Sequence, residues 1–132
     1  MNGFGRSSRK HLATVEGRGQ QLAYRVLRIK DHSIICGHRK QREQDRAYRE
    51  GFSNLPWPDG KHNRLPSVAM DVQTYPVPTN EQALREEQLY LLGLYKGVGS
   101  EMDIPVRTGA DWDGDGEILD NGFDDFFHVE WG

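Results

Sequence analysis

The order of its periodic segments is the feature of this sequence that most limits the fold. Near the front, apolar residues recur at helical spacing in two segments, one with Leu12 and Val15 and one with Leu22, Val26 and Ile29. Most of the short apolar runs that are typical of strands come later in the chain. Helices that precede strands favour an α+β fold, with a small antiparallel sheet and flanking helices.

Capping and breaking residues set the expected boundaries of these segments. Ser7 and Ser8 would cap the first helix, and Gly17 and Gly19 would interrupt the helical spacing after it. A further helix is expected over residues 40–50 with a stop at Gly51, and a long helix that begins after Asn80 carries Leu84, Leu91 and Tyr95 on one stripe. The expected strands cover residues 33–36, 67–72, 104–107 and 126–131, with loops over 52–63 and 108–122.

Composition limits the classes of protein to which this chain can belong. Its 132 residues are the size of one domain, so we expect a single domain over residues 1–132. Apolar residues make up 36% of the chain and the mean hydropathy is -0.78, so no stretch approaches the ~20 apolar residues of a membrane span. Residues 1–6 contain no apolar signal-peptide core, so we expect no signal peptide. The lone cysteine, Cys36, excludes an internal disulfide and a cysteine-rich zinc module.

The net charge of -3 hides an uneven distribution along the chain. Residues 1–50 hold 12 Lys and Arg against 5 Asp and Glu, whereas residues 101–132 hold 1 against 10. The basic front is compatible with a polyanionic partner such as nucleic acid, but we favour the interpretation that these side chains line solvent-exposed helix faces. The acidic end is more informative, because clustered carboxylates are costly unless a cation or a dipole balances them.

Two histidines and a carboxylate in the later part of the chain predict a metal site. His62 comes shortly before the strand that carries Asp71, and His128 lies on the last strand. A catalytic zinc takes three protein ligands and keeps its fourth position for water. Asp125, three residues before His128, could take a proton from that water and later give it to a leaving amine. On spacing alone, triads with other histidines stay open: His11, His32 and His38.

Three segments of the chain, in order, resemble a family of zinc peptidases that cut peptidoglycan stem peptides. The segments are Gly37–Gln44, Lys61–Val72 and Asp125–Trp131. The family contains D-Ala-D-Ala carboxypeptidases and dipeptidases and phage L-alanyl-D-glutamate endolysins. Its pattern is Gly-x-Arg-x-x-x-x-Gln, then Ser-x-His…Ala-x-Asp, then Asp/Glu-x-x-His-x-Glu. This chain departs from the pattern twice: His62 and Asp71 lie farther apart than in the common form, and Gly60 replaces the serine.

The resemblance implies a hedgehog/D,D-peptidase-like fold and a role for each matching residue. The positions of the three zinc ligands are matched by His62, Asp71 and His128. Asp125 matches the general base, and Arg39 matches the arginine that steadies the substrate carbonyl or the oxyanion.

Two more residues are expected to lie next to the site and to support it without binding the metal. Gln44 matches a position beside the site, where we expect a structural role. Glu130 should share a strand face with His128, two residues away. It would then either orient a ligand or be an ordinary exposed strand residue.

The resemblance implies a zinc-dependent peptidase that hydrolyses an amide bond in peptidoglycan stem peptides. The first expectation is the L-alanyl-D-glutamate bond. The alternatives are D-Ala-D-Ala cleavage and a non-catalytic metal-binding module that recognises the wall. By analogy with phage members, the protein would be made in the host cytoplasm without a signal peptide and would reach the wall after membrane permeabilisation. We expect a monomer with no nucleic-acid partner and no membrane insertion.

An acidic segment near the end copies the first half of an EF-hand calcium loop. Acidic residues occupy positions one, three and five, namely Asp111, Asp113 and Asp115, with glycine at six and an apolar residue at eight. Position twelve, where a bidentate glutamate is expected, is Gly122, and Asp120 lies nearby. Three interpretations stay open: a Ca²⁺ site, in this peptidase or in a calcium sensor; a solvated acidic loop; or a loop whose Trp112 shapes the substrate cleft.

Overall fold

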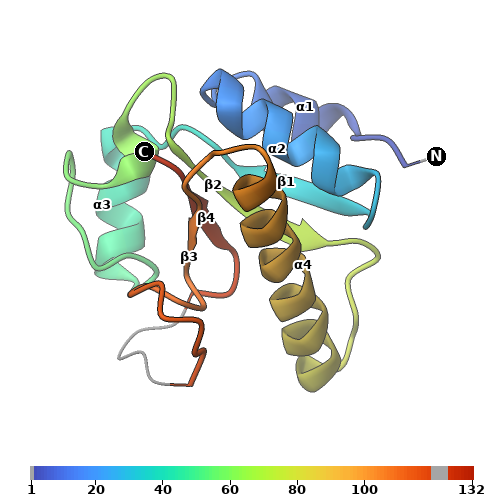
Figure 1. Cartoon of the computed structure of the whole chain (residues 1–132). Coiled ribbons are helices and arrows are strands. Elements are labelled where there is room, and N and C mark those ends of the chain that lie inside the picture. Colours follow the sequence, from blue (N-terminus) through green and yellow to red (C-terminus); the bar gives the residue numbers. More distant parts are fainter. Residues whose placement is uncertain (1, 120–124) are drawn as a thin grey trace.

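The computed structural model describes residues 2–119 and 125–132, and its centre is a four-stranded antiparallel sheet in the order β1-β2-β4-β3 (Figure 1). The strands are β1 (His32–Cys36), β2 (Ala69–Thr74), β3 (Arg107–Thr108) and β4 (His128–Glu130). The helices are α1 (Arg6–Leu12), α2 (Gly17–Leu27), α3 (Gln41–Arg49), the 3-10 turn η1 (Lys61–Asn63) and α4 (Glu81–Glu101). The predicted α+β fold is confirmed.

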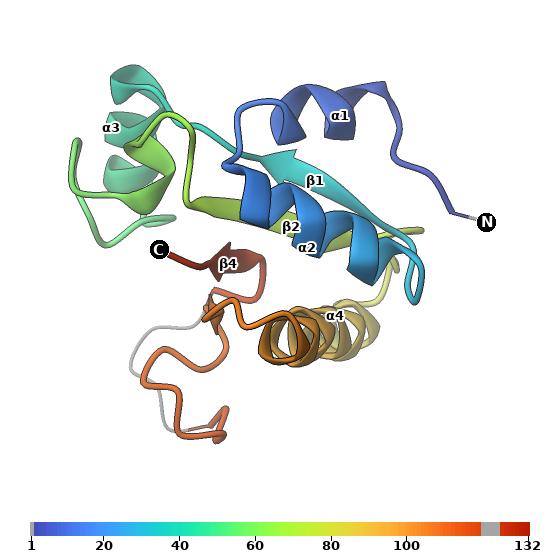
Figure 2. The same cartoon turned by 45° about the horizontal axis from the view of Figure 1, so that its top comes forward.

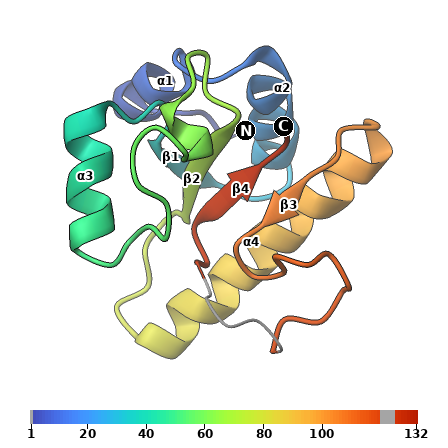
Figure 3. The same ribbon diagram turned by 90° about the vertical axis from the view of Figure 1, so that its left-hand side faces the viewer.

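Three of the helices build the core together with the sheet. α1 packs on β1, α4 packs on β2 and β3, and α2 lies against α4 (Figure 2). Along β2, Met70 and Val72 are fully buried in this core, whereas the alternate residues Asp71 and Gln73 are only partly buried. Strand alternation therefore turns a polar row of β2 away from the core. α3 stands apart from the other helices, at the left of Figure 3.

The first helix starts differently from the prediction. Gly5, rather than a serine, is the N-cap of α1, so Ser7 and Ser8 lie inside the helix. The hydroxyl of Ser8 is buried and accepts a hydrogen bond from the backbone N–H of Ile34 on β1, at 3.0 Å. Ser8 therefore satisfies a backbone donor of another element instead of capping its own helix.

The two glycines after α1 do not break a helix, which is a second correction. Gly17 is the first residue of α2 and Gly19 lies within it. Gly19 is required there because a Cβ at this position would collide with the ring of Trp131. Ile29, expected on the buried stripe, lies beyond the end of α2 and is 55% exposed.

The boundaries of the later helices agree with the sequence better than those of the later strands. α3 ends before Gly51, which adopts a left-handed φ of 80°, and the side chain of Asn80 accepts a hydrogen bond from the N–H of Ala83 as the cap of α4. The strand predicted over 104–107 is displaced to Arg107–Thr108, and β4 is shorter than the predicted 126–131. None of the helices in the described part of the chain has the length and apolar character of a membrane span.

Candidate active site

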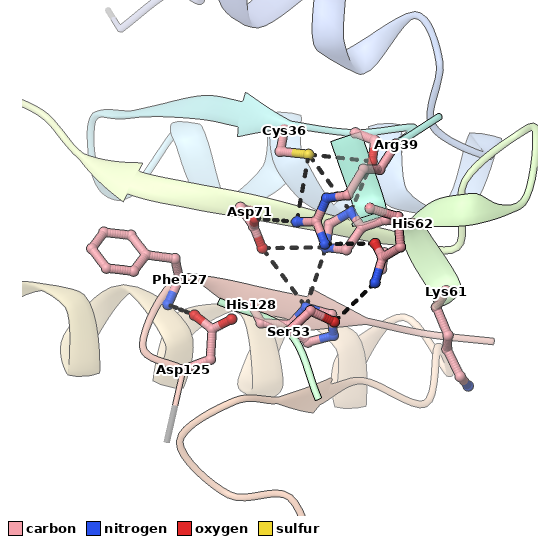
Figure 4. A network of polar contacts seen from close by, with 12 residues as sticks. Cys36, Arg39, Ser53, Lys61, His62, Asp71, Asp125, Phe127 and His128 are labelled. Atoms are coloured by element: carbon pink, nitrogen blue, oxygen red, sulfur yellow. Dashed lines mark hydrogen bonds and ion pairs between the residues drawn. The ribbon is translucent and has the colours of Figure 1, made fainter. Parts of the chain in front are cut away.

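Two strands and the short turn η1 bring the three predicted metal ligands together (Figure 4). Asp71 on β2 is directly opposite His128 on β4, and His62 comes from η1. The Nε2 atom of His62 lies 3.3 Å from Oδ1 of Asp71 and 3.3 Å from Nδ1 of His128. These three ligand atoms form a triangle, and its third edge, from His128 Nδ1 to Asp71 Oδ1, measures 3.7 Å.

The dimensions of this triangle fit a tetrahedral metal ion. Nitrogen and oxygen ligands bind zinc at about 2.0–2.2 Å, so tetrahedral ligand atoms lie about 3.3–3.6 Å from one another. Two edges of the triangle match this separation and the third is only slightly longer. Among the residues that the structure describes, the buried Oδ1 of Asp71 has no hydrogen-bond partner. A buried carboxylate oxygen without a donor is costly, and a cation held between the three groups would satisfy it.

Each histidine uses its other ring nitrogen in a hydrogen bond that directs the free nitrogen into the triangle. Nδ1 of His62 donates to the backbone carbonyl of Gly37 at 2.8 Å, and the sulfur of Cys36 lies 3.9 Å from the same nitrogen. Nε2 of His128 donates to Oε1 of Glu130 at 2.8 Å. These contacts leave Nε2 of His62 and Nδ1 of His128 with lone pairs for a metal.

Glu130 is buried, 5% exposed, so it is not an ordinary exposed strand residue. Arg107 donates to its Oε2 from Nε at 3.2 Å and from a terminal nitrogen at 2.9 Å, and Nζ of Lys61 lies 3.3 Å from the same oxygen. Burial alone would raise the pKa of this carboxyl, but the hydrogen bond from His128 and the charges of Arg107 and Lys61 lower it to about 2. Glu130 therefore stays ionised behind His128.

The electrostatics of the triangle favour a positive charge between the three side chains. Burial alone would lower the pKa of both imidazoles, but the Asp71 carboxylate beside them raises the pKa of His62 and contributes to raising that of His128. Burial alone would raise the pKa of Asp71, but the two neighbouring imidazoles lower it below its ordinary value. The same charge balance suits a divalent cation with Asp71 as its single anionic ligand.

Arg39 and Gln44 form a second layer next to the triangle. Arg39 donates to Oε1 of Gln44 at 2.8 Å and to Oδ2 of Asp71 at 3.4 Å. Gln44 is fully buried, donates to the hydroxyl of Ser53 at 2.9 Å, and accepts from the amide of Asn63 at 3.2 Å. Gln44 therefore fixes the orientation of the Arg39 guanidinium and also anchors the loop after α3.

Asp125, predicted as the general base, is positioned by backbone contacts. Its Oδ1 accepts from the N–H of Phe127 at 3.0 Å, and its own N–H donates to the carbonyl of Gly109 at 2.9 Å. Burial and the negative charge of Asp71 raise the pKa of Asp125 above its ordinary value. A carboxyl with a raised pKa is suited to accept and return a proton.

A cavity of about 550 Å³ opens over the triangle. It is lined by both histidines, by Arg39 and by Asp125. The lining also includes residues that the sequence did not single out as site residues, among them Phe52, Lys61 and Arg107. Lys61 could have been suspected because it precedes His62. Arg107 is opposite Glu130 in the β3–β4 pair, so only knowledge of the strand order reveals it. Trp112 is also in the lining, with its ring centre 5.1 Å from that of His128.

The acidic loop forms a second, more exposed group of carboxylates. Ligand oxygens of Asp111, Asp113 and Asp115 lie within 4.8 Å of one another. Part of their acceptor capacity serves the turns of the loop, since Asp111 accepts from the N–H of Gly116 at 2.9 Å. Gly122, which occupies the position where a bidentate glutamate is expected, and the nearby Asp120 lie outside the described residues.

Comparison with known proteins gives consistent results over the length of the chain. The family profile described as phage L-alanyl-D-glutamate peptidase matches residues 2–131. The L-alanyl-D-glutamate peptidase of Escherichia phage T5 is 30% identical over 132 residues, which covers 96% of both chains. The crystal structure of the Serratia marcescens L-Ala D-Glu endopeptidase ChiX superposes with a TM-score of 0.75 at 19% identity, over 100% of this chain and 90% of that chain, and shows the same fold.

Proposed function

The chain belongs to the phage L-alanyl-D-glutamate peptidase family, and we propose that it hydrolyses the L-alanyl-D-glutamate bond of peptidoglycan stem peptides. The observation that carries this proposal is the triangle of His62, Asp71 and His128, open to a cavity that also contains Asp125 and Arg39. By analogy with phage relatives, the protein would act on the wall after the membrane has been permeabilised.

We propose zinc as the ion that His62, Asp71 and His128 hold. Two imidazoles and one carboxylate are a common ligand set for catalytic zinc. When bound, zinc supplies Lewis-acid chemistry: it polarises the amide carbonyl and lowers the pKa of water to about 7. Glu130 fixes the ring of His128 and the Gly37 carbonyl fixes the ring of His62, so both ligands are oriented before the ion arrives.

Asp125 and Arg39 have complementary tasks in the proposed hydrolysis. Asp125 accepts a proton from the attacking water and then donates it to the departing amine, for which its raised pKa is favourable. Arg39 stays charged throughout and stabilises the negative oxygen that develops on the attacked carbonyl. Gln44 holds the guanidinium in place for that contact.

Digestion of purified peptidoglycan tests the proposed function. Mass spectrometry of the products, with and without a chelator, identifies the broken bond and the need for a metal. We expect new L-alanine carboxyl ends and D-glutamate amino ends, and no cleavage after chelation until zinc is restored. Release of D-alanine instead would show a D-Ala-D-Ala peptidase, and intact peptidoglycan in the presence of zinc would contradict hydrolysis.

Calcium binding by Asp111, Asp113 and Asp115 stays a prediction from the sequence pattern. Titration calorimetry with calcium on the zinc-loaded protein tests it. Absence of heat at millimolar calcium would contradict it and would leave the other two interpretations, a solvated acidic loop or a loop whose Trp112 shapes the substrate cleft.

A further inference from the structure

A second cavity flanks the metal-binding triangle on the side of α3. It has a volume of about 660 Å³ and lies between α3 and the outward-facing residues of β1 and β2, including Ile35, Asp71 and Gln73. The first cavity instead contains His62 and His128. The triangle thus borders both cavities, with its carboxylate in one and its two imidazoles in the other. Each cavity has the size of a pocket for a drug-sized ligand, about 300–1,000 Å³.

Three residues line both cavities: Arg39, Phe52 and Asp125. Arg39 and Asp125 have tasks in the proposed reaction, whereas Phe52 has none so far. Phe52 is 69% exposed, although a large aromatic ring gains much from burial. An exposed aromatic ring at the junction of two cavities, beside the reacting groups, is well placed to be buried by a substrate.

The backbone of Phe52 is held in place in the free protein. Its N–H donates to the carbonyl of Ala47 at the end of α3, at 2.8 Å, and the N–H of Ser53 donates to the same carbonyl at 3.2 Å. The hydroxyl of Ser53 accepts from the buried Gln44, which also holds Arg39. The ring is therefore presented from an anchored position that is linked to the catalytic arginine.

We infer that Phe52 is a substrate-contacting residue, against which the stem peptide packs as it crosses the triangle and occupies both cavities. This inference rests on the proposed function. Substrate residues on both sides of the scissile bond then contribute to binding, as cleavage of an internal bond requires. A peptidase for a terminal residue would instead need one side of the centre closed around a free carboxylate.

Two substrates and two matched variants test the inference. The short substrate ends one residue on either side of the L-alanyl-D-glutamate bond. The long one is a peptidoglycan fragment that carries the sugar on one side and at least two more residues on the other. Phe52→Ala is compared with Leu65→Ala, which removes an equally exposed apolar side chain (70%) that lines neither cavity. Binding of the long substrate is measured separately, by calorimetry in an Asp125→Asn background.

We expect the wild type to prefer the long substrate, and Phe52→Ala to lower its kcat/KM and its affinity by about tenfold or more. The short substrate should be affected less, and Leu65→Ala should behave as the wild type with both. Equal kinetics and affinity of Phe52→Ala and Leu65→Ala would overturn the inference, as would a wild type that cleaves the short and the long substrate equally well. Cleavage of neither substrate by the zinc-loaded wild type would instead contradict the proposed function.

Discussion

Asp71 and His128 are paired directly across the β2–β4 ladder, so their side chains emerge on the same face of the sheet. Residues paired in this way have Cβ atoms about 4.5–5.5 Å apart, which is close enough for both side chains to bind one ion. The sheet therefore supplies two of the three proposed ligands without any help from a flexible loop. Only His62 is added from outside the sheet, by η1.

Replacement of any of the three proposed ligands by alanine should abolish both zinc binding and activity. An ion that binds only the folded state stabilises it by an amount that grows with the logarithm of its affinity, so chelation should lower the Tm of the wild type. The Tm of His62→Ala, Asp71→Ala and His128→Ala should not respond to chelator. Thermal unfolding with and without chelator, together with the metal content of the purified proteins, measures both effects. A variant that keeps stoichiometric zinc would remove that residue from the ligand set.

Asp125→Asn should retain zinc and lose about 10²–10⁴-fold in kcat, the usual contribution of a general acid–base group. The amide oxygen of asparagine can still accept the hydrogen bond from the N–H of Phe127, so the local backbone should be preserved. Rates on the peptidoglycan fragment and the zinc content of the same preparation are the measurements. Turnover near the wild-type rate would exclude Asp125 as the base.

Glu130→Gln should weaken zinc binding by about 10–100-fold, the usual cost of altering a group that orients a ligand. The variant removes the anionic acceptor of His128 and leaves the charges of Arg107 and Lys61 without their common partner. Competition with a chromogenic chelator measures the affinity. Glu117→Gln changes the same charge at an exposed position and should leave zinc affinity unchanged. Equal affinities of the two variants would show that Glu130 does not support the ligand.

His32 should make the protein less stable in moderately acidic solution. This histidine is buried in the core, where Nδ1 donates to the carbonyl of Lys30 and Nε2 accepts from the hydroxyl of Tyr95. Burial lowers its pKa from 6.5 to about 4. Between these values the unfolded chain binds a proton that the folded protein does not. The contribution of His32 is therefore complete above pH 6.5, and about 3 kcal/mol is lost as the pH falls to 4.

Urea unfolding of the metal-free protein between pH 4 and 7 measures this loss, with His32→Gln as the comparison. The glutamine variant should be less stable at neutral pH, because it packs less well, but its free energy of unfolding should depend less on pH over the same range. Parallel pH dependences of the two proteins would contradict the assignment to His32.

The sequence predicted the fold class and the residues of the candidate site because both depend on local patterns. Helical periodicity, the Asn80 cap and the short apolar runs are local, and so are the segments around His62, Asp71 and His128. The local pattern misleads at Ser8 and Gly19 because their roles are tertiary: Ser8 binds the backbone of β1, and Gly19 makes room for Trp131.

Arrangement in space was the part that the sequence could not supply. β4 inserts between β2 and β3, so Glu130 gains Arg107 as a neighbour although 23 residues separate them. Phe52 similarly looks like an ordinary loop residue until α3 and β2 enclose the second cavity beside it. No periodicity or spacing encodes these relationships, because they depend on how the elements pack.

Gly109→Ala should impair catalysis through Asp125 without removing the metal. The N–H of Gly109 donates to the carbonyl of His128 at 3.0 Å, and a Cβ on Gly109 would collide with the backbone carbonyl of Asp125. Because a displacement of about 1 Å can cost about 100-fold in rate, we expect kcat to fall by that order while KM changes little. Gly93→Ala is the matched control, because a Cβ at this position meets nothing within 4 Å. Gly93 is exposed on α4, where alanine has a higher helix propensity than glycine. Steady-state kinetics and zinc content distinguish the two variants, and a folded, zinc-loaded Gly109→Ala enzyme with the kcat of Gly93→Ala would show that the close approach does not position Asp125.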